Sequence, residues 1–162
     1  MNAKEAYEYA SRSKASFYYA ENVLKEPFPE WFGKLIAKSA GYSCQYARNV
    51  LEAPFPLGEV AIARSAEWSC QYARYVLKAP FKLGEKAIAK NGGWSYTYAR
   101  NVLEAPFPLG EVAIARSAYY SYHYAIDVLD AHFPLGEAAI AKDAKYSKDY
   151  RRLFPNPAFF KY

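Results

Sequence analysis

Residues 46–74 read YARNVLEAPFPLGEVAIARSAEWSCQYAR, so the string YAR returns after 26 residues. The same spacing recurs along most of the chain, at Tyr46, Tyr72, Tyr98, Tyr124 and Tyr150. The copies 46–71 and 98–123 differ at only four positions, which are Glu67/Tyr119, Trp68/Tyr120, Cys70/Tyr122 and Gln71/His123. Self-similarity at this period predicts repeated supersecondary units that stack on one another.

Each unit is predicted to hold two helices, as residues 65–90 illustrate. Ser65 is suited to cap the first helix, and Pro80 is expected to end it. At about 100° per residue, one helical face collects the apolar and small residues Ala66, Trp68, Ser69, Tyr72, Ala73, Val76 and Leu77. The second helix is short, with Glu85 in its first turn and Lys90 in its last. Between the helices, Phe81 is expected to anchor the turn.

Stacking of such units predicts an all-α fold, an α-solenoid of two-helix repeats of 26 residues. A helix of about eight residues does not hold in water alone, so the second helix must be stabilised by its neighbours. The units would share one continuous core along a right- or left-handed superhelix. The likeness to TPR and HEAT proteins is one of architecture only, because their motifs are absent.

We interpret residues 1–162 as a single helical-repeat domain. An N-terminal half-unit is predicted at 2–13, repeats at 14–145 and a C-terminal cap at 146–162. One copy, at 18–38, carries an inserted residue. The aromatic tail of Phe159, Phe160 and Tyr162 is expected to fold over the last unit or to form a dimer contact, so a monomer or weak dimer is predicted.

The repeated string resembles tandem repeats of bacteriophages and large DNA viruses, in which units of the type YAxxVLxxPFPxGExxIAK run in series. The resemblance covers roughly residues 2–153. It implies a helical-repeat fold and a phage or viral origin. Those repeats have no characterised function, so the resemblance assigns no functional residue.

Composition restricts the functional classes. The chain has 162 residues, a net charge of +5 and 19% aromatic residues, which allows an acidic partner. No signal peptide and no membrane span are indicated. The only cysteines, Cys44 and Cys70, occupy the same slot of consecutive units, and we expect free thiols in a reducing environment. A cytoplasmic location is predicted, in the host if the chain is viral.

Two aromatic ladders run through the units. One comprises Tyr42, Trp68, Trp94, Tyr120 and Tyr146, and the other is the tyrosine series that begins at Tyr46. They could form a stacking surface for bases or peptides. We favour the interpretation that both belong to the core, with buried hydroxyls bonded to serines of a neighbouring unit.

Basic residues also recur, at Arg48, Arg74, Arg100 and Arg152 and, at the end of the second helix, at Lys38, Arg64, Lys90, Arg116 and Lys142. Such stripes could follow a phosphate backbone. The alternative, which we favour, is local ion pairing. Arg48–Glu52 and Arg100–Glu104 have i,i+4 spacing, and Glu59, Glu85, Glu111 and Glu137 repeat near the cations.

Nothing in the sequence indicates a catalytic, cofactor or metal site. His123 and His132 have no ligand cluster beside them. Binding is instead expected where the units disagree, on the exposed face of the first helix. The candidate partner-binding residues are Gln45, Gln71, Arg74, Tyr96, Arg100, Tyr119, Tyr122 and His123.

The sequence therefore predicts a non-enzymatic repeat scaffold that mediates protein or peptide interaction. A nucleic-acid-binding repeat protein that uses the Arg/Lys stripes is the alternative. No cofactor and no membrane partner are expected.

Overall fold

A computed structural model describes residues 33–34 and 36–155. This part of the chain is all-α, which confirms the predicted fold class. The predicted half-unit at 2–13, most of the copy at 18–38 and the tail with Phe159, Phe160 and Tyr162 lie outside the described residues.

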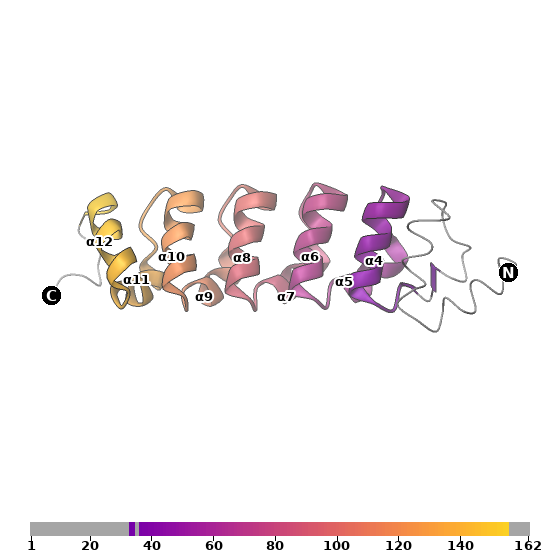
Figure 1. Ribbon diagram of the computed structural model, residues 1–162, viewed down its shortest axis with the longest axis horizontal. Coiled ribbons are helices and arrows are strands. Elements are labelled where there is room, and N and C mark those ends of the chain that lie inside the picture. Colours follow the sequence, from indigo (N-terminus) through magenta and orange to yellow (C-terminus); the bar gives the residue numbers. More distant parts are fainter. Residues whose placement is uncertain (1–32, 35, 156–162) are drawn as a thin grey trace, which may run out of the picture.

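The long first helices of successive units stand side by side in chain order (Figure 1). We call this row the helix-A layer. Its α-helices are α4 (Ala40–Tyr46), α6 (Ala66–Tyr72), α8 (Gly92–Tyr98), α10 (Ala118–Tyr124) and α12 (Ala144–Leu153). The first four continue into π-helical turns, namely η2 (Ala47–Leu51), η3 (Ala73–Leu77), η5 (Ala99–Leu103) and η6 (Ala125–Leu129).

The short second helices form a row along one edge of the helix-A layer (Figure 1). We call this row the helix-B layer. It contains α5 (Pro56–Ile62), η4 (Lys82–Gly84) with α7 (Glu85–Ile88), α9 (Pro108–Ile114) and α11 (Pro134–Ala141). In α5, α9 and α11 a proline begins the helix, where its missing N–H costs nothing.

Each helix of the helix-A layer begins at a polar cap. The Ser65 hydroxyl accepts a hydrogen bond from the Trp68 N–H at 3.3 Å, as expected from the sequence. Ser39 and Ser117 cap α4 and α10 in the same way, while Asn91 caps α8 and Asp143 caps α12. The capping slot therefore keeps its function although its residue changes.

The helix-A ends differ from the expectation that Pro80 stops the helix. The helix ends at Leu77, and Lys78 takes a left-handed conformation with φ 50°. The Ala79 N–H then donates to the Ala73 carbonyl at 3.3 Å and closes the end. Pro80 lies beyond this closure, so the wide turn and not the proline ends the helix.

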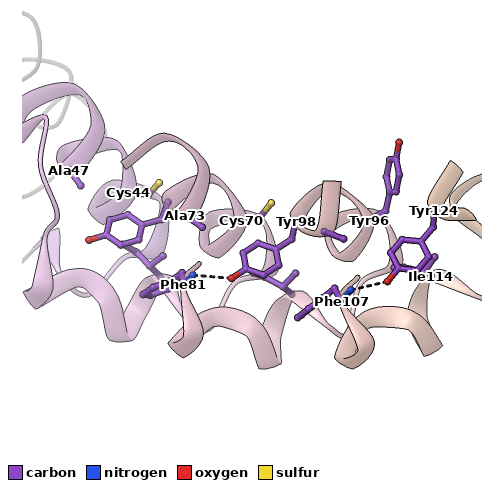
Figure 2. Close-up of a cluster of buried hydrophobic side chains, with 14 of the residues drawn as sticks. Cys44, Ala47, Cys70, Ala73, Phe81, Tyr96, Tyr98, Phe107, Ile114 and Tyr124 are labelled. Atoms are coloured by element: carbon purple, nitrogen blue, oxygen red, sulfur yellow. Dashed lines mark hydrogen bonds between the residues drawn. The ribbon is translucent and has the colours of Figure 1, made fainter. Parts of the chain in front are cut away.

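A buried tyrosine hydroxyl joins each unit to the one before it. Tyr98 Oη accepts from the Phe81 N–H at 2.9 Å and donates to Glu85 Oε1 at 3.0 Å. Figure 2 shows Tyr98 and Tyr124 pointing at the turns that hold Phe81 and Phe107. We call this arrangement the tyrosine bridge. It recurs at Tyr72, Tyr124 and Tyr150, with Phe N–H distances of 2.8 Å.

The expected partners of these hydroxyls, serines of a neighbouring unit, were therefore wrong. The serines have another use, since Ser69 Oγ donates to the Ile62 carbonyl at the end of the preceding helix B. Within its own unit the same serine meets Gly84, where an added Cβ would overlap the Ser69 side chain. The repeated glycine is thus needed for a close approach of helix B to helix A.

The predicted phenylalanine anchors are confirmed. Phe81 is buried and packs edge-to-face on Tyr72 of its own unit, with ring centroids 5.2 Å apart. The same pair recurs in the other units. Each anchor therefore packs on one tyrosine while its backbone N–H bonds the tyrosine of the next unit.

The left-handed residues generate a stability prediction. An L-residue at positive φ is strained by about 1–2 kcal/mol, and glycine is not. We expect Lys78→Gly to raise the free energy of unfolding by about 0.5–1 kcal/mol, because relief of strain exceeds the entropy cost of glycine. Urea denaturation measures the change.

Lys86→Gly is the matched control. Lys86 is an exposed residue of α7, where glycine should lower the free energy of unfolding by up to about 1 kcal/mol. Equal destabilisation by both substitutions would contradict the assignment of strain to Lys78.

Candidate functional site

The tyrosine ladder that begins at Tyr46 is structural. Its five members are at most 3% exposed, which confirms their interpretation as core residues. Burial raises the pKa of the bridging tyrosines, and for Tyr150 the pKa reaches about 12. The second ladder is half-buried and packs against that core. The buried ladder presents no surface for stacking bases.

One slot where the units disagree holds Cys44, Cys70, Tyr96, Tyr122 and Lys148, and the sequence pattern predicts that it lies at or beside the exposed face of the first helix. Cys44, Cys70 and Tyr96 are 2%, 1% and 8% exposed, so the prediction was wrong for these three residues. The slot faces the helix A of the next unit, and the Tyr96 ring lies 6.0 Å from that of Tyr120. Figure 2 shows Tyr96 pointing away from the row of Tyr98 and Tyr124.

Between α8 and α10 the structure brings together Tyr96, Arg100 and His123. Arg100 Nη1 donates to Tyr96 Oη at 3.0 Å, and Tyr96 Oη donates to Asp127 Oδ2. Arg100 and His123 also lie 3.5 Å and 3.7 Å from that carboxylate oxygen. We call these four residues the Asp127 cluster. The Asp127 carboxylate therefore has the Tyr96 hydroxyl, the Arg100 guanidinium and the His123 imidazole as neighbours within the chain.

The electrostatics of the Asp127 cluster follow from these contacts. Burial raises the pKa of Tyr96 to about 12, and the Asp127 carboxylate adds to the shift while Arg100 opposes it. Asp127 escaped the sequence analysis. The signal was present, because its slot reads Asn49, Tyr75, Asn101 and Asp127 along the units.

More aromatic rings surround this cluster. Tyr119 lies 4.5 Å from His123, and Tyr122 lies 5.0 Å from Tyr146, between ring centroids. Tyr119 is 47% exposed, whereas Tyr122 is half-buried. Of the predicted tyrosines in this half of the chain, Tyr119 is therefore the most exposed.

An open groove lies one unit earlier in the helix-A layer. It encloses a cavity of about 240 Å³ between three successive units. Its polar and aromatic lining comes from Arg48, Gln71, Arg74, Tyr75, Trp94 and Thr97. We call it the Arg48–Arg74 groove. Of the predicted residues it gathers Gln71 and Arg74, whereas Gln45 on α4 is half-buried and lines neither site.

The two arginines of the groove share one aromatic ring. The guanidinium carbons of Arg48 and Arg74 lie 4.4 Å and 5.0 Å from the centroid of Tyr75. Gln71 Nε2 donates to Glu67 at 3.2 Å. Tyr75, which is 42% exposed, was not predicted as a site residue.

The predicted i,i+4 ion pairs Arg48–Glu52 and Arg100–Glu104 are not formed within the described range. Glu52 and Glu104 are the left-handed residues that follow the π turns, so they leave the helical face. The repeated glutamates also differ from expectation, since Glu59, Glu85, Glu111 and Glu137 accept the tyrosine hydroxyls. Glu85 also forms a salt bridge with Lys82, at 3.0 Å.

The helix-B layer carries a feature that sequence reasoning missed. Four leucines in one slot are more than half exposed, namely Leu57, Leu83, Leu109 and Leu135 at 53%, 55%, 62% and 57%. We call them the leucine row. Val60 and Val112, which are 60% and 62% exposed, follow Leu57 and Leu109 by one helical turn. The signal was the leucine that follows each turn phenylalanine by two residues.

We also searched the residues that the structure describes for a metal site. No three His, Cys, Asp or Glu side chains there are grouped so as to hold a metal ion. His132 lies with Nδ1 3.2 Å from the buried Glu137 carboxylate. No helix in this part of the protein is both long and apolar enough to cross a membrane.

The chain matches no protein-family model, no curated protein and no solved structure.

The two thiols generate a prediction about reactivity. Both cysteines are free and buried, and burial raises the pKa of Cys44 and of Cys70 from 9.0 to about 11. Only the thiolate form of cysteine reacts, so a pKa of about 11 in place of 9.0 lowers the thiolate fraction at pH 8 about a hundredfold. We expect a thiol reagent to label the native protein at least that much more slowly than the urea-unfolded chain.

The labelling rate of the native protein should rise about tenfold per pH unit between pH 8 and pH 10. Native labelling as fast as that of an unfolded thiol would show that these cysteines are accessible nucleophiles.

Proposed function

We propose that this chain is a non-enzymatic repeat scaffold that binds a protein or peptide. The leucine row supports this proposal most strongly. Single exposed leucines are common on protein surfaces, but these recur in register on adjacent units. Packed helices lie about 8–10 Å apart, so neighbouring members of the row are close enough to form one apolar strip. Such strips characterise protein interaction surfaces.

The helix-A layer supports the same proposal. Its groove and its exposed tyrosines lie at positions where the units differ, while the tyrosine bridge, the anchors and the caps recur. Repeat scaffolds use extended surfaces for binding while a shared core holds the stack. On the motif resemblance, we further propose a phage or viral accessory protein in the cytoplasm.

Nucleic-acid binding is the second candidate. It is favoured by the exposed cations at one slot of every helix-B end, namely Arg64, Lys90, Arg116 and Lys142. Against it, the helix-A stripe is interrupted, because Arg100 is paired with Asp127 and Ile126 occupies the next position. Neutralised or missing cations weaken the field that a phosphate backbone needs.

Site-specific photo-crosslinking tests the proposal. A photoreactive residue replaces Leu83 or Leu109 in the full chain, which is then expressed in its own cells or infected host. We expect discrete protein adducts at both positions. Leu57→Ser with Leu135→Ser should reduce these adducts without unfolding the protein, because substitutions at exposed positions change stability by less than about 0.5 kcal/mol.

A photoreactive residue at Lys90 is the control, since Lys90 is also exposed but lies outside the leucine row. Adducts to nucleic acid would favour the second candidate. The affinity of the protein for mixed-sequence DNA should then fall steeply as the salt concentration rises. The same adduct pattern at Lys90 as at Leu83 would contradict the proposal.

A further inference from the structure

The Arg48–Arg74 groove occupies the position that the Asp127 cluster fills one unit later. Each lining residue has a counterpart 26 residues on: Cys70 corresponds to Tyr96, Arg74 to Arg100 and Thr97 to His123. The counterpart of Asp127 is Asn101. Two junctions with the same backbone repeat thus differ in what fills them.

The filled junction shows what this arginine slot binds. Arg100 holds a carboxylate 3.5 Å away, and the aromatic ring of Tyr96 lies beside it with its hydroxyl bonded to both charges. At the groove the ring is replaced by the small Cys70 and the carboxylate by a neutral amide. A cavity of about 240 Å³ lies beside Cys70, the counterpart of Tyr96.

The positive charge at the groove is not neutralised within the described residues. Arg48 and Arg74 are both exposed and lie against Tyr75, and no carboxylate there forms an ion pair with either. A guanidinium fork suits bidentate binding of a carboxylate. Trp94 provides a half-buried apolar wall, while Gln71 and Thr97 bring polar groups to the rim.

We propose that the Arg48–Arg74 groove binds an acidic peptide segment in which Asp or Glu stands beside an aromatic residue. The carboxylate pairs with the two arginines, and the ring enters the space beside Cys70 and Trp94. The ligand thereby reproduces in trans the contacts that Tyr96 and Asp127 make within the chain. This inference rests on the proposed function and names the chemistry of one of its partners.

The cation pattern favours a peptide over a nucleic acid at this site. The two available arginines lie on one ring, and the next arginine of the slot is already neutralised by Asp127. The positive charge of the groove is therefore confined to two guanidinium groups, which can pair with one or two carboxylates. A phosphate backbone would need cations that continue along the stack.

Fluorescence anisotropy with labelled octapeptide pools tests the inference on the full chain. One pool carries Asp or Glu beside Tyr or Phe at its centre, and the comparison pool carries Asn or Gln instead. We expect only the acidic pool to bind. Arg48→Gln with Arg74→Gln should weaken binding about tenfold or more, since two charge-assisted contacts are removed.

A second variant fills the groove instead of removing its charge. Cys70→Tyr with Asn101→Asp copies the Asp127 cluster, which this backbone already accommodates, and should also weaken peptide binding about tenfold. Lys86→Gln is the charge-matched control. It removes one exposed cation that does not line the groove and should leave peptide affinity unchanged. Circular dichroism verifies the fold of each variant.

Equal binding of the two pools, or full binding by the filled variant, would overturn the inference. So would tighter binding of mixed-sequence RNA or DNA at about 0.15 M salt that competes for the same arginines. Crosslinks from Leu83 and Leu109 do not depend on these arginines. If those persist while the acidic pool fails, the scaffold function stands and only the assignment of this groove is wrong.

Discussion

The tyrosine bridge is the interaction on which the rest of this structure depends. One buried hydroxyl accepts the N–H of the turn phenylalanine and donates to the glutamate of the same preceding unit. Leaving either buried group without a partner would cost about 1–3 kcal/mol, and more for the charged carboxylate. Because the three groups come from two units, the bridge sets how one unit sits on the next. The edge-to-face packing of Phe81 on Tyr72 of its own unit then links this bridge to the one that Tyr72 makes with the unit before.

This constraint separates residues that build the stack from residues free to differ. Tyrosine, phenylalanine, glutamate, glycine and serine recur because each contacts a neighbouring unit or its own partner helix. The slots between successive helices A are filled in two ways. The α8–α10 junction closes with Tyr96 and Asp127, whereas the junction before it leaves two arginines facing an open groove. Function is therefore proposed where the repeats disagree, and on the leucine row that the stack leaves uncovered.

Much of the fold was predictable because its signals are local or periodic. The 26-residue spacing of Tyr72 and Tyr98, the cap at Ser65 and the anchor at Phe81 all indicated the elements that are observed. The predictions were wrong where contacts between units or the shape of the turn determine the position of a residue. A helical wheel places Cys70 near the solvent face, but the adjacent helix A covers it. The π turn and the left-handed Lys78 moved the helix end away from Pro80 and separated Arg48 from Glu52. No local signal in the sequence marks Leu83 as exposed, because leucine is among the residue types most often buried.

Amide hydrogen exchange in Tyr98→Phe tests the central claim most directly. The variant keeps the ring and removes only the hydroxyl that receives the Phe81 N–H. If the tyrosine bridge joins the units, the Phe81 amide loses protection, while the Phe107 and Phe133 amides, bonded to Tyr124 and Tyr150, keep theirs. Unchanged protection at Phe81 in a folded variant would contradict the claim that the tyrosine bridge joins the units.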